Sequence, residues 1–244
     1  MSGEDVNARI EQYWRDQLQH PDWYIRLEDY LRKDIFPMVH DNPALSLQRN
    51  YFYDVVTQML IDRQIPLATS GPDLDSERQP IDTVVIHHTE EDPDISLGKL
   101  SAIGFIRQYA QRYLDDDVYG HKGLRGQPIW SGHFRNGEMV FFAYHWLVRP
   151  DGTTDRLLDD QYVGRHALDL NPRSIGISLS GNYEHFTPPE EQVIATGKII
   201  KESYPFINPT KIFGHLEVIQ QRTCPGDQFI GGWKGTILEA VKNS

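Results

Sequence analysis

Apolar residues recur at helical spacing along residues 1–65, with polar residues between them. A first amphipathic helix is predicted around Trp14, with Ser2 as a candidate N-cap, and Pro21 ends it. Asp22 can cap a second helix, and a third follows it. The apolar positions that define the three helices are Val6, Ile10, Trp14, Leu18, Trp23, Leu27, Tyr30, Leu31, Tyr51, Val55, Met59 and Leu60. We expect either a small bundle or an extension packed on a larger domain.

The pattern changes after residues 65–80, which are rich in Pro, Ser, Gly and Asp and are typical of a linker. The β-branched run IDTVVIHHT (81–89) predicts a buried strand, and shorter runs predict strands at 173–181 and 210–215. Asn136-Gly137 indicates a tight hairpin between two further strands. A second reversal is predicted at Pro150-Asp151-Gly152.

Helices are predicted between these strands, at 96–116 and at the C-terminus over 231–244. Another begins at TPPE, where Thr187 is the expected cap. Strands mixed with helices in this order indicate an α/β or α+β domain. We therefore expect a helical extension with a linker in residues 1–75 and the larger domain in residues 76–244.

Charge and hydropathy exclude several classes of partner. The net charge of −11 argues against nucleic acid and against anchoring on anionic lipid, because both require a basic face. No apolar stretch approaches the ~18 residues needed to cross a bilayer, so we expect no membrane insertion. No secretory signal is visible at the N-terminus. We expect a cytoplasmic protein, or one that is released or exported by a non-classical route.

The chain has a single cysteine, Cys224, so no internal disulfide holds the fold together. A lone cysteine is most often a small core residue, but Cys224 lies between polar QQRT and a Pro-Gly turn. It lies nine residues after His215, and a histidine and a cysteine joined by one loop can form a nucleophile–base pair or bind one metal ion. His87 and His88 are candidate third partners. Side chains alternate along a strand, so only one of the two can join, and periodicity does not choose between them.

Four segments occur in the order found in the zinc-dependent N-acetylmuramoyl-L-alanine amidases of type 2, and the chain resembles that family. They are VVIHHT, AYHWLVRPDGTTDR, GRHALDLNPRSIGISLSGNYE and GHLEVIQQRTCPGD, and they span residues 84–227. The family is similar to the peptidoglycan recognition proteins and the amidase-type phage lysozymes. The resemblance implies an α/β fold with a mixed central sheet flanked by helices. The lack of disulfides argues against a disulfide-stapled animal recognition protein, so we expect a bacterial or phage source. Residues 1–75 share no pattern with the family.

The resemblance implies a Zn²⁺ site and assigns its ligands. The first histidine of IHHT is a zinc ligand in the family, which selects His87, and the other two ligand positions match His215 and Cys224. Tyr144 matches a tyrosine beside the metal-bound water. Other members use a glutamate in place of that tyrosine, at the position that Ser178 occupies here.

Two more residues complete the set of catalytic candidates implied by the resemblance. Arg222 stands where several hydrolytic members carry lysine, and His166 matches a histidine near the substrate. The approach to Tyr144, SGHFRNGEMVFFAYHW, departs from the family pattern, which suggests a remodelled wall of the groove. Arg222 stays protonated and cannot act as a base, so its expected task is to stabilise the developing oxyanion.

The expected function is cleavage of the amide bond between N-acetylmuramic acid and L-alanine, in peptidoglycan or muropeptides, by a zinc-activated water. The alternative is a non-catalytic peptidoglycan-binding recognition module of the same fold. Such modules commonly lack the cysteine, whereas all three ligand positions are filled here. A hydrolase that uses Cys224 and His215 as nucleophile and base ranks lower, because it leaves the match at His87 unexplained.

Overall fold

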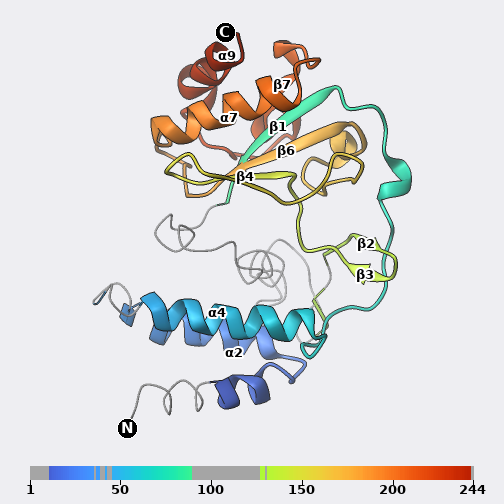
Figure 1. Cartoon of the computed structure of the whole chain (residues 1–244), viewed down its shortest axis with the longest axis vertical. Coiled ribbons are helices and arrows are strands. Elements are labelled where there is room, and N and C mark those ends of the chain that lie inside the picture. The colour runs from blue at the N-terminus through green and yellow to red at the C-terminus, as the bar shows by residue number, and fades with distance from the viewer. Residues whose placement is uncertain are drawn as a thin grey trace. The chain divides into compact units, whose positions relative to one another are not determined.

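The computed structural model describes residues 11–35, 37–38, 42, 46–89, 127–129 and 131–242 (Figure 1). The chain divides into two compact units, one of residues 1–71 and 101–141 and the other of residues 72–100 and 142–244. The helix predicted at 96–116 lies outside the described residues. The second unit begins near the predicted boundary at 75/76, whereas residues 127–141 group with the first unit.

The first unit contains the predicted N-terminal helices. Residues 11–17 are helical, followed by α2 (Trp23–Tyr30), the π-helical turn η1 (Leu31–Ile35) and α4 (Ser46–Ile61). Trp14, Tyr30 and Phe52 form an aromatic cluster with ring centroids 4.6 to 5.5 Å apart. The apolar stripe of each helix therefore packs against the others, as the spacing predicts.

The Asn-Gly signal forms a hairpin in the first unit. Strands β2 (Phe134–Arg135) and β3 (Glu138–Met139) pair antiparallel, and Asn136 and Gly137 both have positive φ, 52° and 80°. Two positive φ values give the turn the twist of the flanking strands. The hairpin is tied to the helices by an ion pair from Arg63 to Glu138.

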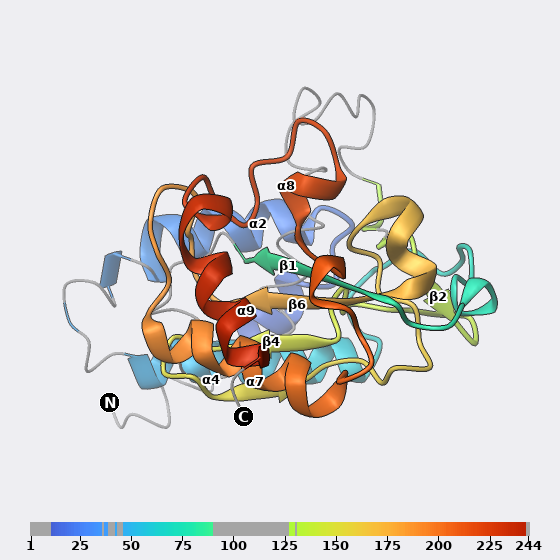
Figure 2. The same ribbon diagram turned by 90° about the horizontal axis from the view of Figure 1, so that it is seen from above.

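The second unit is built on a five-stranded mixed sheet with strand order β5-β4-β6-β1-β7 (Figures 1 and 2). All neighbouring strands run parallel except β4 and β5, and the buried β1 and β6 are the longest. The five strands are β1 (Thr83–His88), β4 (Trp146–Val148), β5 (Thr154–Arg156), β6 (Ser174–Leu179) and β7 (Ile212–Gly214). The chain therefore has the mixed α/β fold that was expected.

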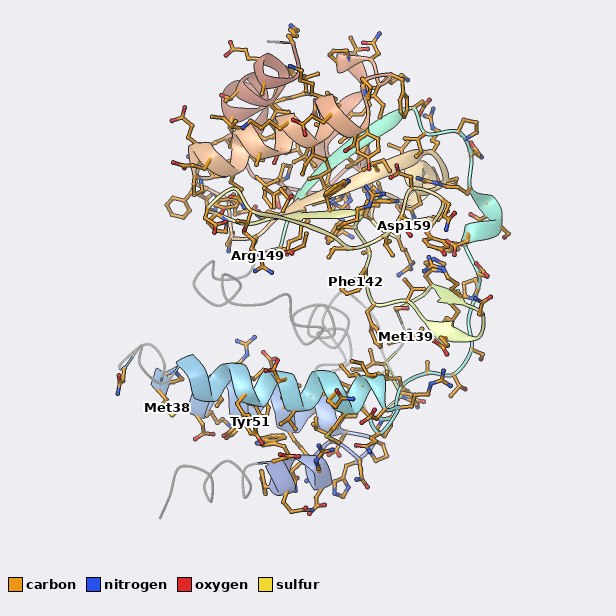
Figure 3. All side chains as sticks on the ribbon, in the orientation of Figure 1. Met38, Tyr51, Met139, Phe142, Arg149 and Asp159 are labelled. Atoms are coloured by element: carbon orange, nitrogen blue, oxygen red, sulfur yellow. The ribbon has the colours of Figure 1, made fainter. Side chains whose placement is uncertain are left out.

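The β4–β5 hairpin forms at the predicted Pro-Asp-Gly reversal. Gly152 has φ 82° and its N–H donates to the carbonyl of Arg149 at 2.9 Å. The guanidinium of Arg149, which is labelled in Figure 3, also pairs with Asp155 at 2.9 Å and so closes the hairpin.

Helices α7 (Glu190–Ser203) and α9 (Lys234–Lys242) pack together above one face of the sheet (Figure 1). The core between them and the strands is mostly aliphatic and includes Val84, Ile86, Ile177, Ile200 and Ile237. Shorter helical segments in this unit are η3 (Asp75–Glu77), η5 (Leu168–Arg173), η6 (Pro209–Lys211), α8 (His215–Val218) and η7 (Phe229–Trp233). Within the described residues no helix combines the length and hydropathy needed to cross a membrane.

The prediction that Thr187 caps α7 is wrong. The cap position is Pro189, and the Thr187 hydroxyl instead donates to Oε1 of Gln228 at 2.7 Å. Since Gln228 also donates to the His185 carbonyl, this polar contact holds residues 185–187 beside the loop that follows Cys224. Asp22 does precede α2, but its carboxylate accepts from Arg26 and makes no cap bond.

We predict that Gly197→Ala destabilises the second unit. A Cβ at Gly197 of α7 would lie 2.5 Å from the Cβ of Ala240 in α9. Overpacking of this kind costs about 1–3 kcal/mol, which exceeds the gain of roughly 0.5–1 kcal/mol from replacing a helical glycine by alanine. Gly235→Ala in α9 is the matched control, because a Cβ there meets no atom within 4 Å. Urea unfolding should give a lower stability for Gly197→Ala only; equal or higher stability would contradict the packing described.

Candidate metal and catalytic site

Strand β1 ends in two buried histidines whose side chains lie on opposite faces. The Nδ1 atom of His88 accepts a hydrogen bond from the Tyr183 N–H at 2.9 Å. The His87 ring instead lies 4.5 Å from the His215 ring and 4.9 Å from the Tyr144 ring, measured between centroids. Alternation along the strand is confirmed, and the structure selects His87 as the neighbour of His215.

His215 is held at the end of β7 by the first turn of α8. Glu217 accepts a hydrogen bond from the Gly214 N–H at 2.8 Å, and Lys234 donates to both of its carboxylate oxygens at 2.8 Å. A Cβ at Gly214 would lie 2.7 Å from the Phe229 ring, so a glycine at this position leaves room for that ring. These contacts fix where the imidazole of His215 can lie.

The loop after α8 brings Cys224 close to His87. The Leu216 N–H donates to the Cys224 carbonyl at 2.7 Å, which closes the loop. The Cys224 Sγ is buried, accepts from the His88 N–H at 3.4 Å, and lies 3.8 Å from Nδ1 of His87. The sulfur therefore lies beside His87 at the end of β1, with the His88 N–H as a hydrogen-bond donor to it.

His87, His215 and Cys224 together form a cluster that can hold a metal ion. One ligand atom from each lies within 4.8 Å of the others. Among the described residues, the buried Nε2 of His215 has no hydrogen-bond partner, and a buried polar atom of this kind is costly unless another group satisfies it. Two nitrogens and one sulfur suit Zn²⁺, and three protein ligands leave one position for water or substrate.

Burial keeps these imidazoles neutral. Desolvation lowers the pKa of His215 to about 4, and the positive charge of Arg222 adds to this effect. Desolvation also lowers the pKa of His87 well below its usual value, with a further contribution from His166. Metal ions bind the unprotonated form of imidazole, so both histidines are in the binding form at neutral pH.

The other three residues predicted for the site lie around this cluster in different environments. Tyr144 is half-buried with its ring beside His87. Arg222 is exposed in the loop after α8, and its positive charge lowers the pKa of His215. His166 is buried, with Nδ1 3.0 Å from Nε2 of His87.

Sequence reasoning missed the residues that support the cluster. Ser174 lies 3.3 Å from Nε2 of His166, and Gly176 provides the space that the His166 ring occupies. Glu217 and Lys234 anchor His215. The sequence contained one indication of this contact: Gly176 lies inside the predicted strand SIGIS. A glycine inside a buried strand often marks the close approach of another group.

The fold and the cluster define a class of protein: a mixed α/β domain that brings two imidazoles and a thiol together at the carboxyl ends of its parallel strands. Residues 77–227 match the sequence profile of the N-acetylmuramoyl-L-alanine amidase family Amidase_2, and the chain belongs to this family.

Individual relatives are distant. The peptidoglycan-recognition protein SC1a/b of Drosophila simulans is 25% identical over 148 residues, which cover 57% of this chain and 77% of that protein. The endolysin of Escherichia phage T7 is 28% identical over 99 residues, covering 35% of this chain and 65% of the endolysin. Among solved structures, the N-acetylmuramoyl-L-alanine amidase LysC from Clostridium intestinale URNW has 22% identity and a TM-score of 0.46, covering 73% of this chain and 95% of LysC.

We predict that His145 makes the fold acid-sensitive. Its ring accepts from the Gly176 N–H and donates to the Tyr162 carbonyl, and burial lowers its pKa to about 4. As pH falls below the unfolded value of about 6.5, the unfolded chain binds the proton first, so stability falls until pH 4. With a chelator present, His145→Asn should reduce the stability lost between pH 7 and pH 4.5 by up to about 2 kcal/mol.

Exposed His185 is the control for this measurement. Asp227 raises its pKa through a hydrogen bond, so its contribution has the opposite sign and is lost as pH rises. His185→Gln should leave the acid-side loss in place. An unchanged pH dependence in His145→Asn would contradict the assignment.

Proposed function

We propose that this protein is a zinc-dependent hydrolase that cuts the amide bond between N-acetylmuramic acid and L-alanine in peptidoglycan or muropeptides. The observation that carries the proposal is the convergence of His87, His215 and Cys224, whose ligand atoms lie within 4.8 Å of one another. Membership of the amidase family supports the reaction class, and the phage T7 endolysin is among its relatives.

His87, His215 and Cys224 would hold the Zn²⁺ ion. A zinc ion in such a site supplies Lewis acidity and lowers the pKa of a water from 15.7 to roughly 7. The chain contributes neutral imidazoles, a buried sulfur and a nitrogen of His215 that has no hydrogen-bond partner among the described residues, all of which fit a divalent cation.

Tyr144 is proposed to orient the attacking water or to pass a proton to the leaving amine. Its ring centroid lies 4.9 Å from that of His87, and the residue is half-buried. Its phenol can donate and accept a hydrogen bond. A tyrosine fits this task here because the nearby strand position used by glutamate in other members is Ser178.

Arg222 is proposed to stabilise the negative charge that develops on the amide oxygen. Its guanidinium is exposed on the loop that also carries Cys224, and its positive charge lowers the pKa of His215, which supports this role. A permanently charged group can bind an oxyanion but cannot accept a proton.

The second candidate function is a peptidoglycan-binding module without catalysis. The similarity to the peptidoglycan-recognition protein of Drosophila simulans favours it. The complete set of His87, His215 and Cys224 favours the enzyme.

We predict that turnover depends on metal and on the Cys224 sulfur. The purified protein should contain zinc and release stem peptides from defined muropeptides, as measured by mass spectrometry. Chelation should abolish release, and Cys224→Ser should lower both zinc content and turnover, because it removes one of three ligands. His185→Gln, a change at an exposed histidine, is the control and should alter neither.

Other outcomes identify the competing functions. Zinc binding and peptidoglycan binding without peptide release would establish the recognition module. Activity that survives complete removal of zinc but is lost on alkylation of Cys224 would establish a thiol hydrolase.

We predict that Tyr144→Phe and Arg222→Ala retain zinc but lose turnover. Loss of one positioned proton donor or oxyanion donor typically lowers kcat by about 10²–10³-fold. Arg222→Lys keeps the positive charge and should retain most of the activity. Wild-type kcat in both Tyr144→Phe and Arg222→Ala would remove these residues from the mechanism.

A further inference from the structure

A chain of buried hydrogen bonds leads away from the metal cluster. Nε2 of His87 lies 3.0 Å from Nδ1 of His166, and Nε2 of His166 lies 3.3 Å from the Ser174 hydroxyl. The other nitrogen of His87, Nδ1, is on the side of Cys224, 3.8 Å from its sulfur. His87 therefore has one nitrogen at the cluster and the other at His166.

The position of His166 is closely determined by its surroundings. The side chain of Asn171 accepts from the N–H of His166 at 2.9 Å and from that of Ala167 at 2.6 Å. A Cβ at Gly176 would lie 2.8 to 3.0 Å from three atoms of the His166 ring. A Cβ at Gly164 would lie 3.1 Å from the same ring. Two glycines thus leave space for this imidazole, and an asparagine fixes its backbone.

A neutral imidazole that presents one nitrogen to a metal carries its proton on the other nitrogen. The group that accepts that proton in a hydrogen bond sets the tautomer and the orientation of the ring. In this chain only His166 lies within hydrogen-bond distance of Nε2 of His87 among the described residues. Ser174 can in turn accept from Nε2 of His166, which leaves Nδ1 of His166 as an acceptor.

We propose that His166 is a positioning residue: it accepts the Nε2 proton of His87 and so holds the Nδ1 lone pair of His87 toward Cys224 and His215. The inference rests on the proposed zinc site and assigns His166 a task other than contact with substrate. Both ring nitrogens of His166 are within hydrogen-bond distance of buried protein groups, and its residue is 8% exposed. His166 therefore orients the ligand His87. Ser174 and Gly176 in turn position the His166 ring.

The test compares two substitutions at residue 166. His166→Asn places an amide oxygen near the position of Nδ1 and so keeps a hydrogen-bond acceptor there. His166→Phe keeps an aromatic ring but removes the acceptor. Zinc affinity is measured by competition with a chromophoric chelator, and the ligand geometry by the absorption spectrum of the Co²⁺-substituted protein. His166→Phe should weaken zinc binding by about 10–100-fold and change the Co²⁺ spectrum, while His166→Asn should stay within about fivefold of the wild type.

Two further variants separate positioning from general destabilisation. Ser174→Ala removes the group that accepts from His166 and should weaken zinc binding less than His166→Phe does. Tyr204→Phe is the control, because Tyr204 bonds to Trp146, Arg156 and Asp160 and to none of the cluster residues. It should lower the thermal stability and leave zinc affinity unchanged.

Nitrogen-15 NMR of the metal-free protein gives a readout that needs neither zinc nor activity. It should show His87 protonated at Nε2. Protonation at Nδ1 would overturn the proposal, as would wild-type zinc affinity in His166→Phe or equal losses in His166→Phe and His166→Asn. If the wild-type protein binds no zinc while His87 carries its proton on Nε2, the proposed function fails and the hydrogen-bond assignment stands.

Discussion

Parallel pairing of β1 with β6 on one side and β7 on the other is the constraint on which the candidate site depends. The register pairs His87 with Ser178 and Ile86 with Gly214, so His215 follows directly at the level of His87. Carboxyl ends of parallel strands share one edge of a sheet, and ligands bind at such edges. One further loop, closed by the bond from Leu216 to the Cys224 carbonyl, adds the sulfur. A slip of one residue in β1 would present His88 in place of His87.

Burial gives this arrangement its chemical character. Removing imidazoles from water lowers their pKa, so His87, His166 and His215 stay neutral and available as ligands or hydrogen-bond partners. Each buried nitrogen then needs a partner. His87 has His166 on one side and the cluster on the other, whereas Nε2 of His215 has no hydrogen-bond partner among the described residues. A divalent cation held by the cluster would bind one nitrogen of each imidazole together with the sulfur of Cys224.

Local sequence signals predicted strands and turns in both units, because each signal rests on a local physical rule. The β-branched run 83–88 is buried on both faces and forms the predicted strand, and Asn136-Gly137 adopts the two positive φ values that its hairpin needs. The alternation of side chains along the strand predicted that His87 and His88 point to opposite faces. It did not show which of the two histidines faces the cluster, because that depends on the partner strands. Family resemblance supplied the choice, and the structure places His87 beside His215 and Cys224.

The remaining features depend on contacts between distant segments. No local pattern indicates that Ser174 lies against His166 or that Lys234 anchors the glutamate after His215. Thr187 matched a capping motif, yet its hydroxyl bonds to Gln228, since a long-range contact replaced the local one. The grouping of residues 127–141 with the N-terminal helices likewise follows from pairing and ion contacts rather than from composition.

X-ray absorption spectroscopy at the zinc edge of the purified protein tests the central claim most directly, because it counts the atoms bound to the ion. The account predicts one sulfur at about 2.3 Å and two imidazole nitrogens at about 2.0–2.1 Å, with one light oxygen atom completing the shell. A shell without sulfur, or a protein that takes up no zinc, would contradict the convergence of His87, His215 and Cys224 on one metal ion.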